Sequence, residues 1–352
     1  MINKIYEDVL NIPAVSGNED LLRKYMKEFI EKYQNFEIKY DNLGSIFGVK
    51  KSNNKNAKTV IIAGHMDEVG FMVANITENG HIKLQPLGGF VSDVLISQVL
   101  NIYTENDIIP GVVGSLPPHL KQANKTNISD FLLDVGASSK SEAESFGIKP
   151  GQMVLFNNQF THTKNNKRVI SKAVDNRFGV GLALETIKHF NDVELEINLV
   201  VGATVQEEVG LRGAQTATKM FKPDVFIALD ASPVNDLTSN EVPGLGKGFL
   251  MRLFDPRNVM HQGLIKFFRE TALENNIKYQ DFTSKGGTDA AAALDELSGV
   301  LSTTIGLPAR YIHSTAAMMD LDDLAAAKEM LFAVINKLDS NVIEKIKGGY
   351  ND

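Results

Sequence analysis

Apolar, strand-like runs that end in a charged or imidazole side chain recur along this chain, with helical patterns between them. The clearest run, at 59–63, is continuously apolar or β-branched and is followed by His65. Such a run is typical of a strand covered on both faces of a sheet. The alternation predicts an α/β fold, in which ligands bind at the carboxyl ends of the strands. The other runs and the helical patterns lie at 168–175, 176–190, 196–208, 209–221, 225–232, 263–276 and 300–314.

Between about residues 70 and 163, short apolar runs are instead separated by glycine and proline, as at Pro86 and Pro110. Turns at this spacing predict a small β-rich unit. We therefore expect an α/β domain built from residues 1–69 and 164–352, interrupted by an inserted β domain at 70–163. Further elements are expected as helices at 2–11 and 18–33, a strand pair within 36–49, and one long helix over 318–346.

The composition narrows the possible chemistry. Cysteine is absent from the 352 residues, which excludes thiol catalysis and thiolate-bound metals. The net charge of −7 disfavours binding to a nucleic-acid backbone. No apolar run approaches the roughly 18 residues of a membrane span, and Glu7 and Asp8 interrupt the region where a signal peptide would be apolar. These features favour a cytoplasmic protein that binds neither nucleic acid nor membrane.

His65 and Asp67 form the first candidate site, because residues two apart on extended backbone point to the same side. The carboxylate could accept the second N–H of the ring, as it does behind many metal-bound histidines. Alternatively, this is a surface histidine at a capped strand end.

Glu207 and Glu208 directly follow a buried run, and a buried carboxylate without a partner costs several kcal/mol. A divalent cation would compensate, with one glutamate as a ligand and the other as a base; alternatively, the pair complements a helix dipole.

Three more strand ends carry candidates. Asp175 ends a strand and opens a helix, where an N-cap aspartate is common. Asp230 ends an apolar strand, and His313 follows another, although a lone histidine is usually structural. If all these side chains converge, two imidazoles and several carboxylates would suit a pair of divalent ions such as zinc, cobalt or manganese. The other histidines are expected at the surface or in structural roles: His81, His119, His162, His189 and His261.

Six stretches resemble those of the glutamyl aminopeptidases in the tetrahedral, co-catalytic metallo-aminopeptidase family. The resemblance implies a zinc-peptidase-like α/β/α sandwich with a mixed sheet. It also implies that the inserted module is a small PDZ-like β barrel that mediates dimerisation, and that the dimers assemble into a tetrahedral dodecamer. The stretches are AGHMDEVGFMV (63–73), LPPHL (116–120), ISKAVDNRFG (170–179), VQEEVGLRGA (205–214), SKGGTDA (284–290) and TTIGLPARYIHS (303–314).

The same resemblance implies removal of the N-terminal residue from a peptide by a di-metal aminopeptidase, with glutamate or aspartate preferred. It gives each candidate a role in that reaction. The roles are general base for Glu207, orientation of His65 for Asp67, a metal bridge for Asp175, and metal ligation for His65, Glu208, Asp230 and His313.

An acidic N-terminal residue would require a positive charge near the site. The first candidate for this substrate contact is Lys285, beside Gly286 and Gly287, and Arg252, Arg257 and Arg310 follow. The family often has proline and glutamate after the last His-Ser, whereas residues 315–317 here are Thr-Ala-Ala, so this part of the pocket wall differs. Two alternatives remain open: another two-metal amide hydrolase, such as a deacylase or carboxypeptidase, and a non-catalytic metal-binding scaffold.

Overall fold

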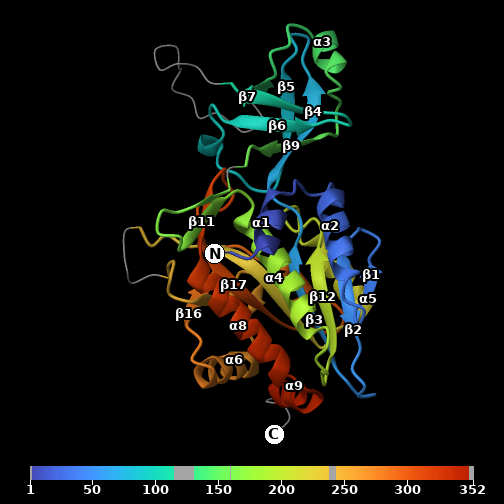
Figure 1. Cartoon of the computed structure of the whole chain (residues 1–352), viewed down its shortest axis with the longest axis vertical. Helices are drawn as coiled ribbons and strands as arrows, with labels where there is room; N and C mark the ends of the chain where they lie inside the picture. Colours follow the sequence, from blue (N-terminus) through green and yellow to red (C-terminus); the bar gives the residue numbers. More distant parts are fainter. Residues whose placement is uncertain (1, 115–130, 159, 238–242, 349–352) are drawn as a thin grey trace.

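A computed structural model describes residues 2–114, 131–158, 160–237 and 243–348 of the chain. It contains a large sheet with helices on both faces and a smaller closed barrel, which lies above the sheet in Figure 1. The LPPHL stretch, with His119, lies outside the described residues. Over the ranges just given, no helix combines the length and the apolar character required to cross a bilayer.

The large sheet is mixed, and its centre consists of four adjacent parallel strands, β12, β3, β13 and β17. In this register Thr204 pairs with His65 and Asp230 pairs with Gly306, so the carboxyl ends of the four strands lie at one edge. Across the sheet the strands are β1 (Glu37–Tyr40), β2 (Ile46–Lys50), β12 (Asn198–Thr204), β3 (Thr59–His65), β13 (Val225–Pro233), β17 (Leu301–Arg310), β18 (Ala317–Asp320), β11 (Arg168–Ser171) and β10 (Thr161–His162), with β14 (Phe249–Asp255), β15 (Asn258–Val259) and β16 (Tyr279–Thr283) attached beside β17.

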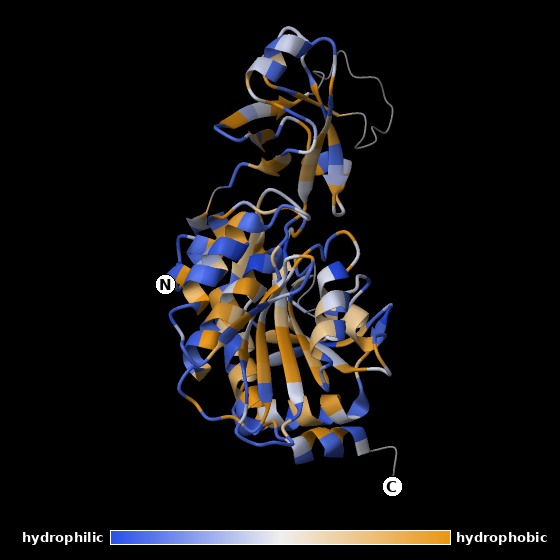
Figure 2. Cartoon of the chain, turned by 90° about the vertical axis from the view of Figure 1, so that its right-hand side faces the viewer, coloured by the Kyte–Doolittle hydropathy of each residue, from blue (hydrophilic) through white to orange (hydrophobic). Residues whose placement is uncertain are grey.

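Alternate residues of β3 pack into two different cores, which explains its continuously apolar sequence. Val60 and Ile62 belong to the larger core, together with α1, α2, α4, α6, α8 and α9. Ile61 and Ala63 belong to a second core with α5 and α7. Figure 2 shows the apolar strands between these two helical layers. The helices are α1 (Lys4–Asn11), α2 (Asp20–Ile30), α4 (Val174–Phe190), α5 (Arg212–Phe221), α6 (Gln262–Glu274), α7 (Asp289–Leu294), α8 (Leu321–Lys337) and α9 (Ser340–Lys347).

The barrel closes on itself and has a separate hydrophobic core, in which Phe71 stacks on Phe90 with ring centroids 4.8 Å apart. The first barrel strand begins shortly after the His65–Asp67 segment, and the chain returns from the barrel to the large sheet at β10. Around the barrel the strands are β4 (Gly70–Ile76), β5 (Ile82–Leu87), β8 (Leu132–Asp134), β7 (Ile108–Val113), β6 (Val99–Tyr103) and β9 (Met153–Phe156), with η1 (Ser92–Val94) and α3 (Lys140–Ser145).

The long helix expected over 318–346 is wrong, because this stretch forms β18, α8 and α9. The backbone N–H of Asp322 donates to the Asp320 side chain, and the N–H of Val342 donates to Asp339. Each aspartate therefore starts a new helix by accepting an N–H group that has no partner within the helix.

Candidate active site

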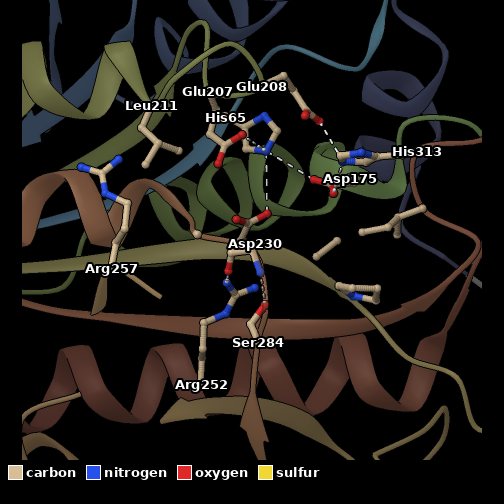
Figure 3. A pocket seen from close by; sticks show the side chains of 15 residues that line it. His65, Asp175, Glu207, Glu208, Leu211, Asp230, Arg252, Arg257, Ser284 and His313 are labelled. Atoms are coloured by element: carbon tan, nitrogen blue, oxygen red, sulfur yellow. Dashed lines mark hydrogen bonds and ion pairs between the residues drawn. The ribbon is translucent and has the colours of Figure 1, made fainter. Parts of the chain in front are cut away.

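Six of the predicted side chains meet in one cavity of about 540 Å³ at the carboxyl edge of the parallel strands (Figure 3). Five have side chains no more than 10% exposed, whereas His313 is 32% exposed. Strands β3, β12, β13 and β17 deliver most of them to this edge, and the start of α4 delivers Asp175. The six are His65, Asp175, Glu207, Glu208, Asp230 and His313.

Both histidines present Nε2 to the acidic side chains. The Nδ1 atom of His65 lies 2.9 Å from the backbone oxygen of Asp67, and that of His313 lies 2.8 Å from the backbone oxygen of Gly89. A carbonyl oxygen can only accept, so each Nδ1 carries a proton, and Nε2 is the nitrogen that each ring could offer to a metal ion. Gly89 lies just after barrel strand β5, so the inserted segment helps to orient a side chain of the site.

Asp175 lies between the two imidazoles. Its Oδ1 is 3.3 Å from Nε2 of His65, and its Oδ2 is 3.4 Å from Nε2 of His313. On the His65 side, Nε2 is 3.7 Å from Asp230 and 3.8 Å from Glu207. On the other side, Nε2 of His313 is 3.4 Å from Glu208. One carboxylate thus faces potential ligands on two sides.

This donor set fits metal ions. His65, Glu207 and Asp230 form one group whose ligand atoms lie within 4.8 Å of one another, and His65, Asp175 and Glu208 form another. Oδ1 of Asp175 and Oε1 of Glu208 are buried without a hydrogen-bond partner. Their nearest partners are the imidazole nitrogens at 3.3 and 3.4 Å. Buried carboxylate oxygens without a hydrogen bond are costly, and a divalent cation would satisfy them.

The electrostatics of the cluster agree with this interpretation. Burial raises the pKa of Glu207 well above its usual value, and burial also raises the pKa of Glu208 to about 6. Burial lowers the pKa of His313, but Asp175 and Glu208 outweigh it and raise that pKa to about 11. Acids that resist ionising and a histidine that resists losing its proton together indicate a site with a deficit of positive charge.

Asp67 contributes more than the expected orientation of His65. Its backbone oxygen is the hydrogen-bond acceptor for the ring, since its carboxylate is 3.5 Å from Nδ1. The carboxylate instead accepts the backbone N–H groups of Glu207 at 3.0 Å and Glu208 at 3.1 Å, as well as the hydroxyl of Ser16 at 2.6 Å. This residue therefore connects the two catalytic segments predicted from the sequence.

Asp175 is not the helix N-cap that its position after a strand favoured. Ala173 occupies the N-cap position of α4, and the carboxylate of Asp175 points into the cavity. Beside this segment, Lys172 and Arg177 form buried ion pairs with Glu68, at a closest approach of 2.5 and 2.8 Å. The pairs hold the start of α4 against the segment that follows β3.

The four candidate cations occupy different surroundings. Arg257 lines the cavity with a side chain 49% exposed, and its Nη2 lies 3.7 Å from the carboxylate of Asp295, which is also exposed. Arg252 also lines it but is buried, and donates to the hydroxyl of Ser232 and the backbone oxygen of Gly286. Lys285 is exposed beside two cavity-lining residues.

Arg310 faces another cavity and forms a two-point ion pair with Asp236 at 2.6 and 2.8 Å. Since this pair already satisfies the guanidinium, the geometry favours Arg257 over Arg310 as a substrate contact.

Sequence reasoning missed two buried acids near the cluster. Asp289, in the GGTDA stretch, accepts a hydrogen bond from the hydroxyl of Thr204, and burial raises its pKa to about 7. Glu19 accepts the backbone N–H of Gln206, and burial raises its pKa to about 7 as well. An acid at the start of an alanine-rich buried helix was an available signal for Asp289; Glu19 gave none.

Fold and site together define a metal-dependent peptidase of the α/β/α type with an inserted barrel. Residues 44–330 match the family model described as M42 glutamyl aminopeptidase, and the chain belongs to this family. It is an aminopeptidase.

The relatives differ in their named specificity. The chain is 40% identical to a glutamyl aminopeptidase of Lactococcus lactis, over 96% of both chains. It is 33% identical to a lysyl aminopeptidase of Pyrococcus furiosus, over 95% of this chain and 97% of the relative. The fold is similar to that of a TET aminopeptidase from a Thaumarchaeota archaeon, with a TM-score of 0.93, 32% identity and coverage of 97% and 98%. The fold is also similar to that of a Pyrococcus horikoshii TET1 peptidase, with a TM-score of 0.86 and 30% identity, over 95% of this chain and 99% of that one.

Proposed function

We propose that this aminopeptidase uses two divalent metal ions, such as zinc, cobalt or manganese, to hydrolyse the first peptide bond of substrates that begin with glutamate or aspartate. The observation that carries the proposal is the position of Asp175 between two imidazoles that both present Nε2. A carboxylate in this position would bridge two cations. His65 and Asp230 would complete one coordination group, and Glu208 and His313 the other.

Bound cations would polarise the scissile carbonyl and lower the pKa of a water molecule. Glu207 would take the proton of the attacking water and pass it to the departing amine. The raised pKa that burial gives Glu207 suits a group that must hold a proton between these two steps. Asp67 would keep Glu207 in place through the backbone N–H at 3.0 Å.

Relatives at 40% and 33% identity carry glutamyl and lysyl names, so family membership alone does not fix the preferred N-terminal residue. A preference for an acidic residue would therefore come from the side chains that line the cavity. Arg257 is the cation that lines the cavity with free surface, and a guanidinium binds a carboxylate at two points. The charge of Arg252 instead acts on Asp230: burial raises the pKa of that carboxyl, and Arg252 lowers it in part. Lys285 remains a second substrate contact in this proposal.

The test is a panel assay. Protein stripped with a chelator and then reloaded with zinc, cobalt or manganese is assayed on Glu-, Asp-, Lys- and Leu-peptides, each with a free or an acetylated amino terminus. We expect activity only after reloading, only on free termini, and fastest on Glu- and Asp-peptides. Hydrolysis of the acetylated peptides would favour a deacylase, release of C-terminal residues a carboxypeptidase, and inactivity after reloading a scaffold.

We also propose that the domain at 70–163 mediates dimers that build a tetrahedral dodecamer in the cytoplasm. Solved relatives described as a dodecamer and as a tetrahedron or octahedral shell support the assembly. Val99 and Val112 are paired neighbours on β6 and β7, 43% and 46% exposed, with Ile108 56% exposed nearby. Apolar surface of this kind is typical of an interface. Replacing both valines by lysine should release smaller species in light scattering; an unchanged mass would place the interface elsewhere.

A further inference from the structure

The turn that carries the general base is held by two buried carboxylates from elsewhere in the chain. Three consecutive backbone N–H groups, at 206, 207 and 208, point toward acids. Those of Glu207 and Glu208 donate to Asp67, and that of Gln206 donates to Oε1 of Glu19 at 3.2 Å. Glu19 is only 3% exposed, and the same oxygen accepts the N–H of Gly17 at 2.9 Å.

The turn needs such support because of its backbone. Gln206 has φ +55°, in the left-handed region that a residue with a side chain rarely adopts. A conformation of this kind costs on the order of 1–3 kcal/mol and persists when surrounding contacts define it. Within the segment, Arg212 donates to both the backbone and the side-chain oxygen of Gln206, at 3.3 and 2.8 Å. Glu19 fixes the N–H side of the same residue.

The N-terminal segment is itself fixed to the catalytic strand end. Val15 forms a bridge with Glu68, and the hydroxyl of Ser16 donates to Asp67. Glu19 therefore reaches the turn from a segment already anchored beside Asp67, 187 positions away in sequence from Gln206.

We infer that Glu19 is a positioning residue for Glu207: by accepting the N–H of Gln206 it sets the turn that aims the base at its substrate. The inference rests on the proposed role of Glu207 as general base. Misplacement of a catalytic group by about 1 Å can cost on the order of 100-fold in rate.

The test compares Glu19→Met, which fills the space without an acceptor, with Glu19→Gln, whose amide oxygen can accept the same N–H groups. We expect Glu19→Met to lower kcat by about 10- to 100-fold with KM within about threefold and bound metal unchanged. Glu19→Gln should recover most of kcat. The control is Glu28→Ala, which changes an exposed acid of α2, the helix that directly follows Glu19. If Glu19→Met shows no cooperative thermal unfolding, Glu19→Asp takes its place in the test. The shorter aspartate side chain would move the carboxylate oxygen away from the N–H of Gln206.

A double mutant separates positioning from general damage. In a Glu207→Gln background the base is already gone, so Glu19→Met should cause little further loss, because residues that act as a unit are not additive. An equal loss in both backgrounds, or full kcat in Glu19→Met, would overturn the inference. Full activity of Glu207→Gln alone would instead overturn the proposed base, and the inference with it.

Discussion

His65 is held by the backbone oxygen of Asp67 rather than by its carboxylate, with Nδ1 at 2.9 and 3.5 Å from the two acceptors. The main chain and the side chain of Asp67 thus hold different parts of the site. Its main chain fixes the imidazole, which leaves Nε2 to face the acidic cluster, and its side chain fixes the backbone of the Glu207–Glu208 turn.

This division predicts an unusual phenotype for Asp67→Asn. The backbone oxygen still holds His65, so bound metal should be retained. The amide loses one acceptor for the turn, so we expect kcat to fall by about 10- to 100-fold. Steady-state kinetics and metal analysis check this, with the exposed Asp93→Asn as the control. Loss of metal in step with activity would show that the carboxylate holds the histidine after all.

Buried acids predict how the stability of the metal-free protein depends on pH. Burial raises the pKa of Asp289 from 3.8 to about 7. Between these values the folded Asp289 keeps a proton that the unfolded chain has released, so its contribution to the free energy of unfolding falls as pH rises and levels off above about 7. Urea unfolding of chelated protein at pH 5 and pH 8 should show this fall.

Asp289→Asn should flatten the dependence, because the amide does not titrate. A residual fall should remain from Glu19, whose pKa burial also raises to about 7, and from Glu207, Glu208 and His313, whose pKa values are raised as well. Glu28→Gln, an exposed change, should leave the wild-type dependence intact. The same steep fall in Asp289→Asn as in the wild type would rule Asp289 out as its source.

Specificity should depend on the cation with free surface in the cavity. Arg257→Ala should lower kcat/KM on Glu-peptides by about 10- to 100-fold, since a hydrogen bond to a charged group is worth about 1.5–3 kcal/mol, while Leu-peptides change little. Arg310→Ala is the matched control, because its guanidinium is occupied by Asp236 outside this cavity. Equal losses on both peptides would exclude Arg257 as the selector, and a selective loss in Lys285→Ala would transfer that role to Lys285.

The convergence of the site was predictable because it follows from topology. Strands β3, β12, β13 and β17 are parallel neighbours, so polar residues at their carboxyl ends meet at one edge of the sheet, independently of the conformation of the connecting loops. The local patterns for His65, Glu207 and Asp230 each allowed a simpler interpretation, and only their common edge favoured the metal site.

What the sequence did not reveal depends on long-range contacts. The hydrogen bond of Glu19 joins a side chain to a backbone N–H, and such a pairing leaves no periodic pattern in either segment. Asp175 looked like a helix cap because its strand–helix context is typical of one. The break between α8 and α9 depended on whether Asp339 would cap or continue a helix, a choice that neighbouring packing decides.

We propose that His65, Asp175, Glu208, Asp230 and His313 hold the metal ions and that Glu207 is the base. The most direct test is Glu207→Gln, with metal content and peptide turnover measured on the same sample. We expect about two divalent ions per chain, as in the wild type, and turnover lower by about 10²- to 10⁴-fold. Near-normal turnover with the metal retained would rule out Glu207 as the base.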